Sequence, residues 1–176
     1  MATKKFNKKL FEQNDPKARK IAKEYFAKRG IKLEDHKNKY GPDLVAKCKL
    51  CLEAFGENTT LDICEICGGD PEYQTCEFCP PFYVEVEIKR VWKDKKFPWA
   101  TVQFPERKAK YVYQSNIPVK FFMLNAKCNR AFIVDGKDIL KSKLVPVYNK
   151  YMKGGDEFFF QVPIEKGEFV DIGDKN

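Results

Sequence analysis

Apolar and polar positions alternate most regularly in the stretch YVEVEIKR, residues 83–90. Three apolar side chains alternate there with three charged ones: Val84, Val86 and Ile88 with Glu85, Glu87 and Lys89. A period of two residues is typical of a β-strand with one apolar and one charged face. The charged face is either an open surface of a sheet or a site in which carboxylates and an ammonium act together.

A helical period is clearest over residues 14–31. We expect Asp15 to cap this helix, Pro16 to occupy its first helical position and Gly30 to end it. Its apolar stripe has five members: Ala18, Ile21, Ala22, Tyr25 and Phe26.

Shorter runs predict the remaining elements. Five further strands are expected at residues 31–36, 42–47, 119–124, 130–135 and 157–164, with a turn at 135–138. Two further helices are expected at 104–115, led by Pro105, and at 138–145. The strands at 42–47 and 83–90 then form a hairpin whose turn is replaced by an insertion of about 30 residues.

Composition indicates a globular protein. The 176 residues, 43% of them hydrophobic, suit one domain, residues 1–176, with an inserted subdomain at 48–79. No run of about 18 apolar residues and no signal peptide is found, so we expect a cytoplasmic protein (inside the host cell if it is viral) with no membrane partner.

Charge is distributed unevenly along the chain. Residues 1–39 hold 13 basic and 5 acidic residues, whereas residues 48–79 hold one Lys and seven acidic residues. A net charge of +8 is suited to a polyanion such as DNA, although many basic proteins bind no nucleic acid. The acidic insertion would be repelled by phosphates, so we expect it to be a structural clasp or a contact for a basic partner.

Six of the seven cysteines form three CxxC pairs: Cys48 and Cys51, Cys64 and Cys67, Cys76 and Cys79. This spacing lets two thiolates bind one Zn²⁺ ion, so we expect structural zinc, with iron–sulfur as the alternative metal. One ion with a spare pair, or two ions that also use His36, a carboxylate or a shared thiolate, are both open. The outer pairs are favoured as ligands, and Cys128 is expected to be a core residue.

Asp43 begins one strand of the predicted hairpin, and Glu87 and Lys89 lie on the other. The two carboxylates can converge on one side of the sheet, with the lysine two residues further along the same face. Mg²⁺ is commonly held by one or two carboxylates, and a nearby ammonium stabilises charge that develops on a phosphate. The three residues are therefore a minimal site for phosphodiester hydrolysis.

The motif formed by Pro42, Asp43, Glu87 and Lys89 resembles that of the PD-(D/E)xK nuclease superfamily. The predicted order of elements over residues 15–135 is also similar to that of the family. The resemblance implies an α/β, restriction-endonuclease-like core with a central mixed β-sheet flanked by helices, and here a small zinc-bound insertion. The gap between Asp43 and Glu87 departs from a simple hairpin, and the insertion accounts for it.

The resemblance also implies roles for individual residues. Asp43 and Glu87 would bind Mg²⁺ (or Mn²⁺) together with the backbone carbonyl of Ile88, and Lys89 would orient the attacking water. The products would carry 5′-phosphate and 3′-hydroxyl ends. Glu24 would be an additional acid from the first helix; its alternative is a solvated residue paired with Lys28.

Four residues after the ExK strand are candidates for binding the scissile phosphate: Gln103, Arg107, Lys108 and Lys110. A solvated helix face is the alternative. Glu85 is expected to be a solvent-exposed residue, with an acid that supports the metal ligands as the alternative. Trp92, Phe97 and Trp99 are expected in the core, with base stacking as the alternative.

We therefore expect a metal-dependent DNA endonuclease. The excess of 28 Lys over 5 Arg favours structure-selective or weakly sequence-specific cleavage, and cutting both strands from a single site would require a homodimer. The alternatives are a non-catalytic zinc-containing module that binds nucleic acid or protein, and a nuclease fold that has lost its activity.

Overall fold

The computed structural model describes residues 8–37, 41–46, 82–114, 117–148 and 156–173. The side chains of residues 8–15 and of Asp156 are outside this description. The inserted segment 48–79, with its six cysteines, also lies outside the described residues, so the predicted zinc subdomain stays a prediction.

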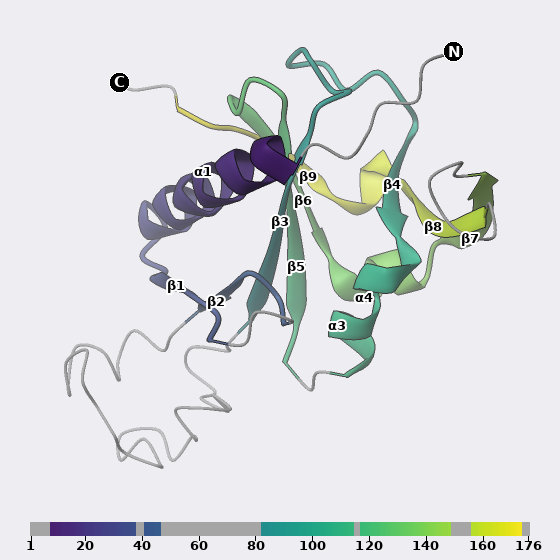
Figure 1. Ribbon diagram of the computed structural model, residues 1–176, viewed down its shortest axis with the longest axis horizontal. Coiled ribbons are helices and arrows are strands. Elements are labelled where there is room, and N and C mark those ends of the chain that lie inside the picture. Colours follow the sequence, from purple (N-terminus) through teal and green to yellow (C-terminus); the bar gives the residue numbers. More distant parts are fainter. Residues whose placement is uncertain (1–7, 38–40, 47–81, 115–116, 149–155, 174–176) are drawn as a thin grey trace.

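A six-stranded mixed sheet forms the centre of the molecule (Figure 1). Its strands are β1 (Leu33–Asp35), β2 (Leu44–Ala46), β3 (Tyr83–Lys89), β5 (Val119–Asn125), β6 (Arg130–Asp135) and β9 (Glu168–Asp171), in the order β1-β2-β3-β5-β6-β9. β3 and β5 are parallel, and the other neighbours are antiparallel. The predicted α/β class with a central mixed sheet is confirmed, as is the β2–β3 hairpin.

Helix α1 (Lys8–Ala27) covers one face of this sheet (Figure 1). The helix continues through Pro16, so the predicted start at Asp15 and Pro16 was wrong. Proline is favoured in a first turn but does not exclude an interior position, where it removes one backbone hydrogen bond. The predicted end at Gly30 is confirmed, with φ +74° at this residue and the Ile31 N–H bound to the Phe26 carbonyl at 3.0 Å.

The other face of the central sheet carries a second, three-stranded sheet (Figure 1). It contains β4 (Thr101–Pro105), β8 (Asp156–Pro163) and β7 (Lys143–Tyr148), in the order β4-β8-β7. Short helices connect the two sheets: η1 (Glu106–Lys108), α3 (Lys110–Tyr113), α4 (Gly136–Leu140) and η2 (Ile164–Lys166). The expectation of helices on both faces is therefore only partly met.

Two hydrophobic cores fill the spaces between these layers. One lies between α1 and the central sheet and includes Phe26, Leu44 and Phe122; the other lies beneath the second sheet and includes Trp92 and Phe132. Strand β5 contributes to both cores, which explains its continuous apolar sequence. No helix in the described part of the chain is long and apolar enough to cross a membrane.

Local predictions outside the main strands were less accurate. The helix expected at 104–115 consists of the end of β4, one 3₁₀ turn and the four-residue α3. The turn expected at 135–138 is the start of α4, and the helix expected at 138–145 ends at Leu140 before β7 begins. Strands β4, β7 and β9 were missed.

The β5–β6 turn agrees with its sequence. Cys128 has φ 57° and is buried in the core beside α1, as expected. Asn125 is fully buried, and its side-chain oxygen accepts hydrogen bonds from the backbone N–H groups of Asn129 and Arg130 at 3.0 and 3.2 Å. Asn125 is therefore a structural turn residue.

Candidate active site

Asp43 lies where the β2–β3 hairpin opens. Leu44 is paired with Val84, and Asp43 stands one residue before β2 begins. One Asp43 carboxylate oxygen (Oδ2) accepts a hydrogen bond from the Val86 N–H at 2.8 Å. The Asp43 carboxylate is therefore bound to the backbone of β3 at Val86, the residue between Glu85 and Glu87.

Arg19 connects helix α1 to this carboxylate. Its Nη2 atom lies 2.7 Å from Asp43 Oδ1, and its Nη1 atom donates to the Asp43 backbone carbonyl at 3.3 Å. Charge-assisted bonds of this kind restrict the orientation of a carboxylate. Sequence analysis missed Arg19, because the periodic pattern places it only on the polar side of α1.

The charged face of β3, formed by Glu85, Glu87 and Lys89, is not an open surface. The side chains are 8%, 31% and 22% exposed respectively. The interpretation of this face as a solvent-exposed strand surface was wrong, as was the expectation that Glu85 is solvated. The reason is the second layer, since β4 and η1 cover this face of β3.

Lys108 is the residue of η1 that reaches β3. Its Nζ atom lies 2.9 Å from Glu85 Oε1 and 3.2 Å from Glu87 Oε2, and its side chain is 17% exposed. The structure thus places Lys108 among the acidic residues. A contact of this side chain with DNA, as its sequence position suggested, would require it to leave both glutamates.

These contacts separate the pKa values of the two glutamates. Burial raises the pKa of Glu85 to about 7, while Lys108 opposes this rise and Asp43 adds to it. Burial also acts on Glu87, but the attraction of Lys108 and Lys89 lowers the pKa of this carboxyl below its usual value. For Lys108, burial is outweighed by Glu87 and Glu85, which raise the pKa of the ammonium.

Lys89 is held beside Glu87, on the same face of β3. Its Nζ atom lies 3.4 Å from Glu87 Oε1 and donates to the Gln103 backbone carbonyl at 3.2 Å. Gln103 is therefore next to the site through its backbone, while its side chain is exposed. Ile88, between the two charged residues, packs its side chain against the core beside α1.

The acidic residues offer few ligands for a metal ion. Within the described ranges, no three His, Cys, Asp or Glu residues gather closely enough to hold an ion together. Mg²⁺ is held by one or two carboxylates and keeps several waters, whereas Ca²⁺ needs more protein oxygens. Asp43 and Glu87 supply hard oxygen ligands suited to Mg²⁺, and bound carboxylate oxygens retain further lone pairs.

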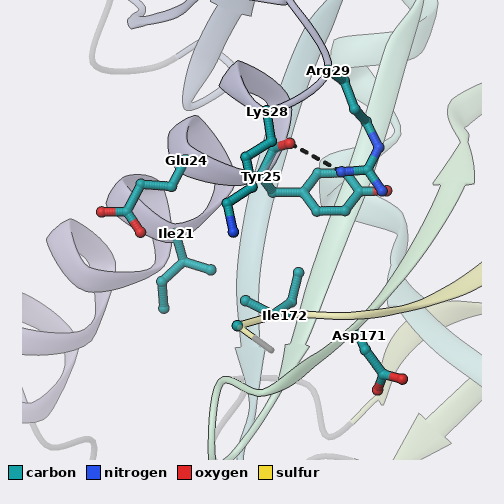
Figure 2. A pocket seen from close by; sticks show the side chains of 8 residues that line it. Ile21, Glu24, Tyr25, Lys28, Arg29, Asp171 and Ile172 are labelled. Carbon is teal, nitrogen blue, oxygen red and sulfur yellow. Dashed lines mark hydrogen bonds between the residues drawn. The ribbon is translucent and has the colours of Figure 1, made fainter. Parts of the chain in front are cut away.

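Glu24 lies in a different environment. Its side chain is 62% exposed and pairs with Lys20 at 3.9 Å, rather than with Lys28 as the alternative proposed. It lines a shallow pocket of about 100 Å³ between α1 and the end of β9 (Figure 2). The lining of this pocket includes Lys28 and Asp171 but none of Asp43, Glu87 and Lys89.

The remaining candidates lie around the site or in the core. The Arg107 side chain is 70% exposed and pairs with Glu157 at 3.2 Å, while Lys110 is exposed and lies 5.0 Å from the Tyr111 ring centroid. Among the aromatic residues, the fully buried Trp92 confirms the expected core position, and Trp99 is 46% exposed. The His36 ring lies 5.2 Å from that of Tyr83; its predicted cysteine partners lie outside the described residues.

Comparison with known proteins gives no match: no family model, no curated protein and no solved structure is detectably similar to this chain. The functional argument therefore depends on the geometry of the site.

Proposed function

We propose that this protein is a metal-dependent DNA endonuclease that hydrolyses phosphodiester bonds. The observation that supports this most strongly is the bond between Asp43 and the Val86 N–H. It brings an acidic residue on one strand next to the strand that carries Glu87 and Lys89, although 43 residues separate Asp43 from Val86. This contact supports the proposal, because the PD-(D/E)xK motif needs its first acid beside the strand that carries the second acid and the lysine.

Each residue has a distinct role in this proposal. Asp43 and Glu87 would hold Mg²⁺ or Mn²⁺, with the Ile88 carbonyl as a further ligand, and the ion would supply Lewis-acid activation of the scissile phosphate. Lys89, oriented by Glu87 and the Gln103 carbonyl, positions the attacking water. Arg19 keeps the Asp43 carboxylate in place. Cleavage then leaves 5′-phosphate and 3′-hydroxyl ends.

DNA is the expected substrate because the chain is basic and exposed cations lie near the site. The net charge is +8, and Arg107, adjacent in sequence to the half-buried Lys108, is largely exposed. The predominance of Lys over Arg supports attraction to phosphates more than recognition of bases. We therefore propose structure-selective or weakly sequence-specific cleavage.

A plasmid-nicking assay tests this function. Wild-type protein is incubated with supercoiled DNA in Mg²⁺ or Mn²⁺, with an excess of EDTA as control, beside Asp43→Asn and Lys89→Ala. We expect metal-dependent nicking that falls about 100-fold or more in both variants. Lys127→Ala is a matched control, since this exposed lysine pairs with Asp94 at 3.4 Å.

Supercoiled plasmid is only one substrate, so flaps, junctions and single strands are tested in parallel. DNA binding without cleavage of any substrate, unchanged in Asp43→Asn and Lys89→Ala, would contradict the proposal and favour a zinc-containing binding module.

A further inference from the structure

Lys108 is a half-buried cation that the nuclease motif does not include. Its ammonium lies between Glu85 Oε1 at 2.9 Å and Glu87 Oε2 at 3.2 Å. The lysine comes from η1 in the second layer, whereas both glutamates belong to β3. A lysine so enclosed is uncommon unless it is paired, so this contact is a specific feature of the fold.

Glu85 has an oxygen that this contact leaves unused. Its Oε2 atom is buried and has no hydrogen-bond partner in the described part of the chain. The side chain is only 8% exposed. A buried carboxylate oxygen without a donor is unfavourable, and it is a feature expected where a ligand binds.

We propose that Glu85 and Glu87 form a cation-binding pair that the Lys108 ammonium fills in the metal-free protein, and that a divalent ion enters by displacing this ammonium. The inference rests on the proposed nuclease function, shares Glu87 with it, and adds Glu85 and Lys108 as residues that control metal loading. The exchange breaks no covalent bond: the ammonium leaves with its protons, and the ion takes over the two carboxylates.

The Lys108 ammonium and a divalent ion cannot occupy the Glu85–Glu87 pair at the same time. A divalent ion shared by Glu85 and Glu87 would occupy the space within about 3 Å of both carboxylates where the Lys108 nitrogen now lies. Repulsion between an ammonium and a divalent ion is strong at such distances when water is excluded. The released Lys108 side chain, next to the exposed Arg107, is then free to contact a phosphate of the bound DNA.

The proposal is tested by titrating Mn²⁺ into DNA-free, full-length protein and measuring the bound fraction by electron paramagnetic resonance. Lys108→Met removes the competing ammonium, and we expect it to bind Mn²⁺ about tenfold more tightly than wild type. Adding Glu85→Gln to Lys108→Met should abolish this gain. Lys127→Met is the matched control and should stay within about twofold of wild type.

Unchanged or weaker Mn²⁺ binding by a folded Lys108→Met would overturn the proposal, as would a gain that persists when Glu85→Gln is added. Lys108→Met leaves two carboxylates without their cation and could lose its fold, which circular dichroism would reveal. A second measurement therefore uses wild-type protein carrying ¹³C-labelled lysine. Mg²⁺ should shift the Cε resonance of Lys108 but not that of Lys127; an unchanged Lys108 resonance at saturating Mg²⁺ contradicts the exchange.

These results are independent of the nicking assay. Tighter Mn²⁺ binding by Lys108→Met without cleavage of any DNA would support the exchange and reject the nuclease. Nicking that requires Asp43 and Lys89, together with unaltered Mn²⁺ affinity in Lys108→Met, would support the nuclease and reject the exchange.

Discussion

Glu85 and Glu87 show how the position of a carboxyl group changes its pKa. Both belong to β3 and contact the same Lys108 ammonium, but only Glu87 also contacts Lys89. The Glu85 side chain is the less exposed of the two, and burial together with the nearby charge of Asp43 raises its pKa to about 7, whereas the attraction of Lys108 and Lys89 lowers the pKa of Glu87. At neutral pH, Glu87 is therefore ionised, whereas Glu85 is ionised only in part.

The raised pKa of Glu85 predicts a pH-dependent stability. Between pH 4.5, the ordinary value, and about 7, the folded protein keeps a proton that the unfolded chain has lost. Stability from this group is thus full below about pH 4.5 and falls as the pH rises towards 7. Measured by urea denaturation in divalent-free buffer, wild type should lose about 1–3 kcal/mol relative to Glu85→Gln between pH 4.5 and 8.

The lowered pKa of Glu87 acts in a different range, because its contribution is lost only as the pH falls below its ordinary value. The contributions of the two glutamates to stability can therefore be measured in separate pH ranges. A constant difference between wild type and Glu85→Gln across pH 4.5 to 8 would show that the pKa of Glu85 is not raised.

At the scale of elements, the site depends on the point where β2 leaves β3. The described part of β2 contains only three residues. Beyond its end, the Val86 N–H of β3 donates its hydrogen bond to the Asp43 carboxylate and not to a backbone carbonyl of the neighbouring strand. Arg19 fixes the same carboxylate from α1. Asp43 therefore has a structural role in addition to the proposed metal-binding one.

Two substitutions separate these roles. Asp43→Ala removes the acceptor of the Val86 N–H and should lower the free energy of unfolding by about 1–3 kcal/mol. Asp43→Asn keeps an oxygen acceptor for the Val86 N–H but loses the ion pair with Arg19, so it should lose about 1 kcal/mol in stability, less than Asp43→Ala, while losing nicking activity. Chemical denaturation measures the difference, and equal losses in the two variants would argue against the hydrogen bond.

The end of α1 gives a test that does not involve the active site. Gly30 has φ +74°, and nothing lies within 4 Å of an added Cβ, so Gly30→Ala introduces backbone strain without a steric clash. We expect it to lower the free energy of unfolding by about 1 kcal/mol, with a smaller effect for Gly30→Asn. Thermal and urea denaturation would show this, and an unaffected Gly30→Ala would contradict the assigned helix end.

At the scale of the whole molecule, the sequence predicted the strongly periodic elements. The region around α1 and strands β1, β2, β3, β5, β6 and β8 were expected, because buried faces determine their patterns. Part of strand β7 was assigned to a helix, because its own sequence lacks a strand pattern and it forms a strand through pairing with β8. Strand β7 also includes Pro146, and proline argues against a strand in sequence analysis. Isolated short strands such as β4 and β9 carry too few residues to show a period.

The site was predicted only where a motif indicated it. Glu87 and Lys89 form a local signature, Asp43 follows Pro42 in a second one, and the structure brings Asp43 to the strand that carries the first. The environment of Glu85 could not be predicted, because alternation along β3 shows which residues share a face but not what covers that face. The contacts of Lys108 depend on how η1 packs against β3. Lys108 lies 21 residues after Glu87 in the sequence, so no local pattern indicates these contacts.

The overall charge predicts salt-dependent DNA binding. With a net charge of +8 and exposed cations such as Arg107, the logarithm of the association constant should fall linearly with that of the salt concentration. Arg107→Ala should reduce this slope by about one if the side chain contacts a phosphate. Fluorescence anisotropy at several salt concentrations measures the slope, and a slope near zero would be inconsistent with phosphate binding.

The measurement that tests the proposed nuclease activity most directly compares the Mg²⁺-dependent nicking rate of Glu87→Gln with that of Asp135→Asn. Glu87→Gln keeps the size of the side chain and removes the charge, whereas Asp135 is an exposed acid that pairs with Lys120 on the neighbouring strand. We predict a loss of about 100-fold or more for Glu87→Gln and less than about twofold for Asp135→Asn. Nicking by folded Glu87→Gln at the wild-type rate would contradict the proposed active site.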